Sequence, residues 1–310
     1  MRTQSLTAAD LQGVFPVPPL ARAAGHRLDP DQNRRIVEHI LAGGPSRLLY
    51  GGNAFLHHIT MQEYEALLEW LSSLPDSAWC IPSAGPSFGR AMDQAPVLRR
   101  HGFPCVMVLP CRDPRDAPGL ERGLREFSDA AAAPLMVYCK DESDFGTDIE
   151  AGLDAIGRLV DSGVCVAIKY AIVRNKPEED RYLSGLLKRV DKSLVLSGIG
   201  ERPAIVHMQQ WGLPGFTTGS GCIAPHLSQA ILDACVRKDF ATAQSIRENF
   251  LPLEDIRDAK GPARVLHHAT EAAGIARTGP IPPFVSPLSS SEIAQLRAVA
   301  EELAGALVTL

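Results

Sequence analysis

Short apolar runs alternate with amphipathic segments along most of the sequence. The amphipathic segments, such as 148–163, carry apolar residues at three- and four-residue steps, and this spacing predicts helices. The apolar runs have the length and the Gly and Pro boundaries that are typical of strands. Eight of them occur, at 13–19, 47–53, 78–85, 104–111, 134–140, 164–172, 193–200 and 215–223.

The alternation also predicts how the strands pair. Strands separated by single helices lie parallel and are joined by right-handed crossovers. The runs 105–109 and 164–168 are apolar at every position, as expected for strands whose sheet is covered by helices. We therefore predict the α/β class and a (β/α)8 TIM barrel. An open doubly wound sheet is the alternative, but 17–25 lacks the GxGxxG-type turn that usually follows its first strand.

After the eighth run the sequence has helical spacing only. We expect residues 1–225 to form the barrel core. Residues 226–310 would supply the last barrel helix and C-terminal helices that pack on the barrel as part of one structural unit. The proline-rich segment 280–288 predicts an extended connector, and Ser289 and Glu292 then have the spacing of a capping box.

The charge balance and the cysteines limit the classes of function. A formal net charge of −5, from 31 basic and 36 acidic residues, offers no basic excess for nucleic acid. The seven cysteines contain no CxxC pair, which favours buried thiols in a reducing compartment over a disulfide scaffold. No apolar stretch suits a signal peptide or a membrane span, so we expect a cytoplasmic protein that acts on a small neutral or anionic molecule.

Lys169 is the first candidate for catalysis. Alternation along 164–172 places Cys165, Ala167 and Lys169 on one face and the bulkier aliphatic residues on the other. The bulky face should meet the helices, so Lys169 would point into the barrel near the carboxyl end of its strand, where barrel active sites lie. Burial there would lower its pKa and leave a neutral amine that can form an imine with a ketone. The alternative is a lysine that reaches solvent from the end of the strand.

Tyr138 ends the preceding strand, about 4.8 Å away across the sheet. Its hydroxyl could exchange protons during imine formation, and a nearby ammonium group would favour the phenolate form. The alternative is a core tyrosine that bonds to backbone. For the acidic residues that follow, Asp141, Glu142 and Asp144, we favour a solvated loop over a functional cluster.

The histidines do not form a metal motif. His57 and His58 are adjacent, as are His267 and His268, and neighbouring residues on a strand or a helix point in different directions. Because no HxH or HExxH segment accompanies them, we expect no bound metal. His58 stays open as a contact for the substrate.

Several segments together resemble the dihydrodipicolinate synthase and N-acetylneuraminate lyase family. Tyr138 in LMVYCKDESDFG and Lys169 in VAIKYA are 31 residues apart, similar to the family's spacing of its YN(V/I)P and GIK(E/D)(A/S/T) motifs. The start LQGVFPVPPL and the segments GGNAFLHHITMQEY and SPLSSSE are also similar. The resemblance implies a pyruvate-type Schiff base on Lys169 and Tyr138 as general acid and base. It also implies no metal or organic cofactor, and a tetramer built from two dimers.

The sequence departs from the family in its binding segments. Gly52 and Asn53 replace the two hydroxyl residues of the family's GTTGE motif, so backbone N–H groups and the Asn53 amide would have to hold the carboxylate. Cys111 and Arg112 stand where many relatives place a tyrosine that reaches across the dimer. Arg112 is either a ligand for a carboxylate or sugar hydroxyl, or part of a solvated loop. Thr217 in the eighth strand completes the candidate binding residues.

The leading hypothesis is a class I lyase that makes or breaks a carbon–carbon bond through an imine with pyruvate or a related 2-oxo acid. An alternative keeps the imine but ends in dehydration or deamination of a 2-oxo sugar acid or a hydroxylated imino acid. A second alternative is a non-catalytic binding protein on the same scaffold. The arginine that synthase members place after their tyrosine motif is missing, which argues against a role in lysine biosynthesis. We expect a homo-oligomer, either a dimer or a tetramer.

Overall fold

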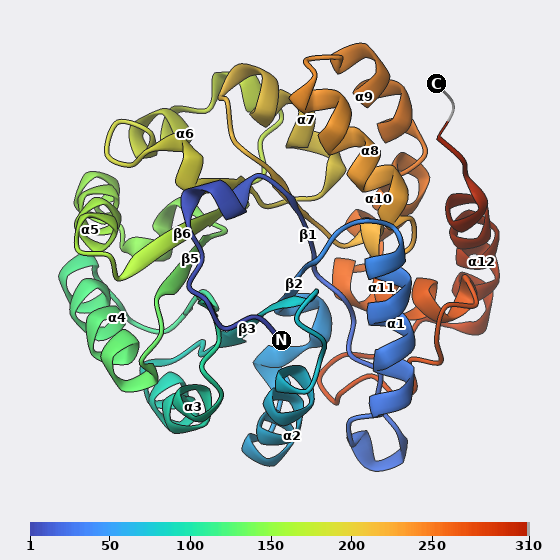
Figure 1. Cartoon of the computed structure of the whole chain (residues 1–310), viewed down its shortest axis with the longest axis horizontal. Coiled ribbons are helices and arrows are strands. Elements are labelled where there is room, and N and C mark those ends of the chain that lie inside the picture. The colour runs from blue at the N-terminus through green and yellow to red at the C-terminus, as the bar shows by residue number, and fades with distance from the viewer. Residues whose placement is uncertain (309–310) are drawn as a thin grey trace.

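Eight parallel strands form a nearly closed barrel in the computed structural model, which describes residues 1–308 (Figure 1). Their hydrogen-bonded order, β1-β8-β7-β6-β5-β4-β3-β2, places sequence neighbours side by side. This order confirms the predicted (β/α)8 barrel and excludes the doubly wound alternative. The strands are β1 (Val14–Pro16), β2 (Arg47–Tyr50), β3 (Trp79–Ala84), β4 (Val106–Val108), β5 (Leu135–Cys139), β6 (Cys165–Tyr170), β7 (Val195–Ser197) and β8 (Phe216–Thr218).

One α-helix follows each strand, and these helices form a ring around the barrel (Figure 1). In α5 the buried residues include Leu153, Ile156 and Leu159, whose three-residue spacing gives the helix one apolar face for the barrel. Asp148 begins this helix, because its carboxylate accepts a bond from a first-turn backbone N–H. The helices are α1 (Pro30–Ala42), α2 (Met61–Ser72), α3 (Phe88–His101), α4 (Ala117–Ala131), α5 (Ile149–Asp161), α6 (Arg181–Leu186), α7 (Glu201–Gln210) and α8 (Pro225–Val236).

Four further helices follow the barrel, in line with the helical spacing of this part of the sequence. They are α9 (Phe240–Glu248), α10 (Leu251–Lys260), α11 (Pro262–Ala272) and α12 (Ser290–Gly305). The expected capping box is confirmed, because the Ser289 and Glu292 side chains each accept a bond from the other residue's backbone N–H. Helix α11 packs on α10 and α12 and also on the short 3-10 helix Gly52–Ala54, which follows β2. The appended helices therefore reach the carboxyl ends of the strands.

The N-terminal segment covers the opposite end of the barrel and crosses it in dark blue in Figure 1. The backbone N–H of Arg2 donates to Ala78 at 3.4 Å, and that of Leu6 donates to Pro104 at 3.3 Å. Both acceptors precede strands, and the Arg2 guanidinium lies 5.1 Å from the centre of the Trp79 ring. This segment therefore covers the amino ends of the strands, opposite the carboxyl ends where barrel active sites lie.

Candidate active site

Lys169 and Tyr138 lie side by side at the carboxyl ends of β6 and β5. The strands pair Tyr138 with Lys169 and Met136 with Ala167, after a register shift that follows Leu135. The Nζ atom of Lys169 lies 4.3 Å from the centre of the Tyr138 ring. Lys169 is only 5 % exposed, so its burial contradicts the solvent-reaching alternative.

The environment of Lys169 favours its neutral form. Burial lowers the pKa of Lys169 from 10.5 to about 7, and the positive charges of Lys140 and Arg257 act in the same direction. A large fraction of the amine is therefore unprotonated at neutral pH. This is the form that attacks a ketone carbon.

Tyr138 ionises less readily than the sequence interpretation expected. Burial raises the pKa of Tyr138 to about 12, and the negative charge of Asp144 adds to this effect. The expected shift toward phenolate is therefore wrong, because desolvation and Asp144 outweigh the influence of a lysine that is itself close to neutral. At neutral pH Tyr138 holds its proton, so it can donate to a reacting oxygen before it accepts.

Gly52 and Asn53 lie opposite this pair in the circular strand order, after β2. The amide nitrogen of Asn53 donates to the carbonyl of Val17 at 2.8 Å, which fixes the side chain beside the end of β1. A Cβ added to Gly52 would meet no atom within 4 Å, so the backbone there borders open space. Both residues are placed where a small ligand can meet them.

Thr217 occupies the middle of β8 and is 1 % exposed. Its neighbour Thr218 accepts a bond from the backbone N–H of Gly221 at 2.7 Å, on the side of the strand that faces the helices. Alternation then turns the Thr217 side chain toward the interior of the barrel. It pairs with Phe15, the middle residue of β1, so it lies one residue before the carboxyl end of β8.

Arg112 lies in the loop between β4 and α4, where its side chain is 60 % exposed. Its Nη1 atom is 3.9 Å from a carboxylate oxygen of Asp144. No contact in the described part of the chain brings it to Lys169. Of the two interpretations of Arg112, this geometry favours the solvated loop.

Asp144 is not a solvated residue, so our preference for a solvated acidic loop was wrong at this position. It is 5 % exposed, and one carboxylate oxygen accepts the backbone N–H groups of Lys140 and Asp141 at 2.7 and 2.8 Å. The Arg115 side chain donates to the Asp144 carbonyl at 3.0 Å. Asp144 therefore shapes the turn that leaves β5 directly after Tyr138.

Arg257 of α10 is a site residue that the sequence interpretation missed. It is 9 % exposed, and its Nη1 atom donates to the hydroxyl of Ser220 at 2.9 Å. A Cβ added to Gly219, after β8, would lie 2.7 Å from Cζ of Arg257 and 2.9 Å from the amide nitrogen of Asn53. Arginines of amphipathic helices normally face solvent, so only the packing of the appended helices brings this one to the site. The segment Gly219–Gly221 was the one signal in the sequence, since glycines allow close approach to backbone.

Two buried carboxyl groups lie close to Arg257. Glu201 is fully buried and Glu254 is 4 % exposed. Oε1 of Glu254 accepts the Glu201 backbone N–H at 3.3 Å, and Oε1 of Glu201 accepts the Ser228 hydroxyl at 2.6 Å. Burial raises the pKa of Glu201, and burial together with the negative charge of Glu201 raises that of Glu254 to about 8, against the lowering influence of Arg257. Neither carboxyl group forms an ion pair with Arg257 within 4.0 Å in residues 1–308.

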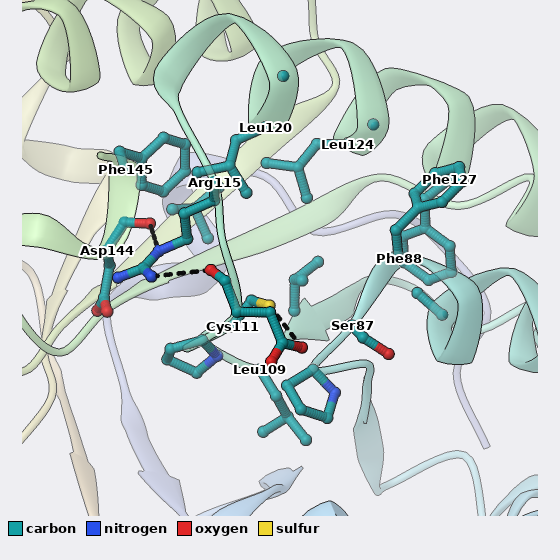
Figure 2. Close-up of a pocket in the computed structure, with 18 of the residues that line it drawn as sticks. Ser87, Phe88, Leu109, Cys111, Arg115, Leu120, Leu124, Phe127, Asp144 and Phe145 are labelled. Atoms are coloured by element: carbon teal, nitrogen blue, oxygen red, sulfur yellow. Dashed lines mark hydrogen bonds between the residues drawn. The ribbon is translucent and has the colours of Figure 1, made fainter. Parts of the chain in front are cut away.

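A cavity of about 750 Å³ opens between α3 and α4, beside the site (Figure 2). Its wall is mainly apolar, with Arg115, Asp144 and Cys111 on one side. Tyr138 also contributes to the wall, whereas Lys169 and Asn53 do not. The cavity therefore adjoins the phenol and does not enclose the amine. Its labelled apolar residues are Phe88, Leu109, Leu120, Leu124, Phe127 and Phe145.

None of the helices within residues 1–308 is long and apolar enough to cross a membrane. In the same range, no group of three or more His, Cys, Asp and Glu residues is arranged to hold a metal ion.

Similarity to known proteins extends over nearly the whole chain. A model of the dihydrodipicolinate synthetase family matches residues 11–303. No curated protein sequence matches the chain.

Several solved structures have the same fold. The dihydrodipicolinate synthase from Oceanobacillus iheyensis is 22 % identical with a TM-score of 0.81, over 95 % of this chain and 97 % of that one. The enzyme from Agrobacterium tumefaciens is 16 % identical with a TM-score of 0.83, over 96 % and 99 %. YagE, a prophage protein of Escherichia coli K12 in complex with pyruvate, is 19 % identical with a TM-score of 0.79, over 94 % and 98 %.

Proposed function

Because the chain belongs to the dihydrodipicolinate synthetase family, we propose that it is a Schiff-base lyase for pyruvate or a related 2-oxo acid. The observation that carries the proposal is the enclosed Lys169 amine, 5 % exposed and 4.3 Å from the Tyr138 ring. A buried lysine whose pKa lies near 7 is poised to act as a nucleophile. The pyruvate complex of YagE, a protein with the same fold, supports this choice of substrate.

The proposed reaction begins when the neutral amine of Lys169 attacks the ketone carbon. Tyr138 donates its proton to the resulting alkoxide, and loss of water from the carbinolamine gives a protonated imine. The imine accepts electrons from the adjacent carbon, which gives up either a proton or an aldehyde and leaves an enamine. In the reverse direction the enamine carbon attacks an aldehyde. We therefore propose reversible aldol cleavage as the reaction.

Reductive trapping tests the imine. Incubation with pyruvate and borohydride should add the mass of pyruvic acid less one oxygen atom, since water leaves and the imine is then reduced. Peptide mapping should locate this mass on Lys169. Lys169→Met should abolish the adduct, whereas Lys176→Met, which removes an exposed lysine paired with Glu179, should not.

The result that contradicts the proposal is an intact chain that forms no adduct with pyruvate or with a panel of other 2-oxo acids. That outcome would favour the binding-protein hypothesis. If the adduct forms, product analysis with 2-oxo sugar acids separates the two lyase reactions, because aldol cleavage releases an aldehyde and dehydration releases only water.

A further inference from the structure

Arg257 is a buried cation that forms no close ion pair in the described part of the chain. Its Nη1 atom donates to the Ser220 hydroxyl at 2.9 Å and its Nε atom donates to the Pro262 carbonyl at 3.4 Å. Within residues 1–308, no carboxylate oxygen lies within 4.0 Å of its guanidinium. Buried charges in proteins are normally paired, since an unpaired one costs several kcal/mol.

The other buried arginine of the chain shows the usual arrangement. Arg22 is 2 % exposed, and its Nε atom donates to a carboxylate oxygen of Glu63 at 2.6 Å. Its remaining nitrogens donate to the carbonyls of Leu20 and Ala54 at 3.3 and 3.0 Å. Each guanidinium nitrogen of Arg22 thus donates to an acceptor of the protein, so it needs no ligand.

The free edge of Arg257 faces polar donors. Its Nη2 atom lies against Gly219, beside the amide nitrogen of Asn53, and has no hydrogen-bond partner in the part of the chain that the structure describes. A Cβ at residue 219 would lie 2.2 Å from this Nη2 atom, so the guanidinium can approach Asn53 here only because the residue is glycine. Donors that converge without an acceptor form a site for an anion.

The same charge reaches Lys169, because Arg257 is among the groups that lower its pKa. A 2-oxo acid carries its carboxylate on the carbon next to the ketone, so a molecule bound to Lys169 must place an anion within a few bond lengths of the amine. The carboxyl pair Glu201 and Glu254 acts on Arg257 only from a distance, because in the described residues neither group forms an ion pair with it within 4.0 Å.

We propose that Arg257 binds the carboxylate of the 2-oxo acid whose ketone carbon reacts with Lys169. This inference rests on the proposed function. The guanidinium supplies two parallel donors that match a carboxylate, and Asn53 borders the same position. Arg257 thereby binds the carboxylate in place of the hydroxyl residues that are absent at Gly52 and Asn53.

The test compares pyruvate with pyruvamide, which has the same ketone but no charge. Adduct formation is measured by borohydride trapping at pH 9, where Lys169 is neutral whether or not Arg257 is present. For Arg257→Gln, the half-saturating pyruvate concentration should rise roughly 10- to 100-fold, as expected for a lost charge-assisted hydrogen bond. The half-saturating pyruvamide concentration should stay within about twofold of the original.

Two further variants keep the result decisive. Arg297→Gln removes an exposed arginine of α12 and should leave the half-saturating concentrations of both ketones unchanged. Arg257→Lys keeps the charge but not the paired donors. It should therefore raise the half-saturating concentration of pyruvate by an intermediate factor and leave that of pyruvamide unchanged. This variant decides the question if Arg257→Gln fails to show a cooperative thermal unfolding transition.

Two outcomes separate this inference from the proposed function. If Arg257→Gln changes the half-saturating concentrations of pyruvate and pyruvamide equally, or changes neither, Arg257 does not bind the carboxylate. The Lys169 adduct still forms in that case, so the proposed function is unaffected. An unaltered chain that forms no adduct with either ketone contradicts the imine itself, and with it any ligand at Arg257.

Discussion

The two sides of the barrel mouth are built in different ways. The reactive wall, Tyr138 and Lys169, consists of residues on paired strands, and their register fixes the distance between them. The arginine wall, Asn53, Gly219 and Arg257, combines two loops with a helix that follows the barrel. The difference suggests that this chain keeps its chemistry in the sheet and changes its binding groups in the segments around it.

The largest expected effect is on the reactive wall. Tyr138→Phe removes the proton that leaves with the ketone oxygen, so we expect exchange of the pyruvate methyl protons in D2O to slow by about 10²- to 10⁴-fold. Nuclear magnetic resonance follows this exchange without knowledge of the second substrate. Tyr182→Phe is the matched control, since Tyr182 is buried and packs on Tyr170 in the outer layer. Equal exchange in the two variants would remove Tyr138 from the mechanism.

The sequence was sufficient to predict the reactive wall and the barrel that holds it. The alternation of short apolar runs with amphipathic segments predicted all eight strands, because the period of a strand follows directly from its backbone geometry. The same rule oriented Lys169, and adjacency in the sheet brought Tyr138 to it. The phenolate was predicted wrongly because desolvation and the charge of Asp144 depend on a turn whose shape cannot be read from residue types.

The arginine wall could be predicted only in part. Asn53 was proposed because it stands where the resembling family has a hydroxyl residue in its GTTGE motif. Arg257 was missed because its helix has ordinary amphipathic spacing, and the docking of α10 and α11 depends on tertiary packing. Arg112 was proposed from its place after a strand, yet its side chain is 60 % exposed and only its Nη1 atom approaches Asp144, at 3.9 Å.

Burial of Lys169 should reduce stability in a way that depends on pH. Its pKa is about 7 in the folded chain and 10.5 in the reference state, so the unfolded chain binds more protons between these values and stability rises with pH across them. Lys169→Met removes this cost. We expect its free energy of unfolding to exceed that of the unaltered chain by roughly 4 kcal/mol below pH 7, and by progressively less toward pH 10.5.

Urea unfolding at pH 6 and pH 9.5 measures this difference, with Lys176→Met as the exposed control. If Lys169→Met raises the free energy of unfolding by the same amount at both pH values, Lys169 titrates normally in the folded chain. The reactive wall would then lack the neutral amine on which its chemistry depends.

The smallest effect should lie on the arginine wall, at Asn53. Its amide nitrogen already donates to Val17, so it can offer a ligand little more than one neutral hydrogen bond. Asn53→Ala should raise the half-saturating pyruvate concentration about fivefold and leave the maximal rate of methyl-proton exchange unchanged. Asn249→Ala serves as the control, because Asn249 is exposed and donates only to Ile246 of its own helix. A lower maximal rate at unchanged half-saturation would instead assign Asn53 to the chemistry, and the division of the mouth into a reacting side and a binding side would not hold.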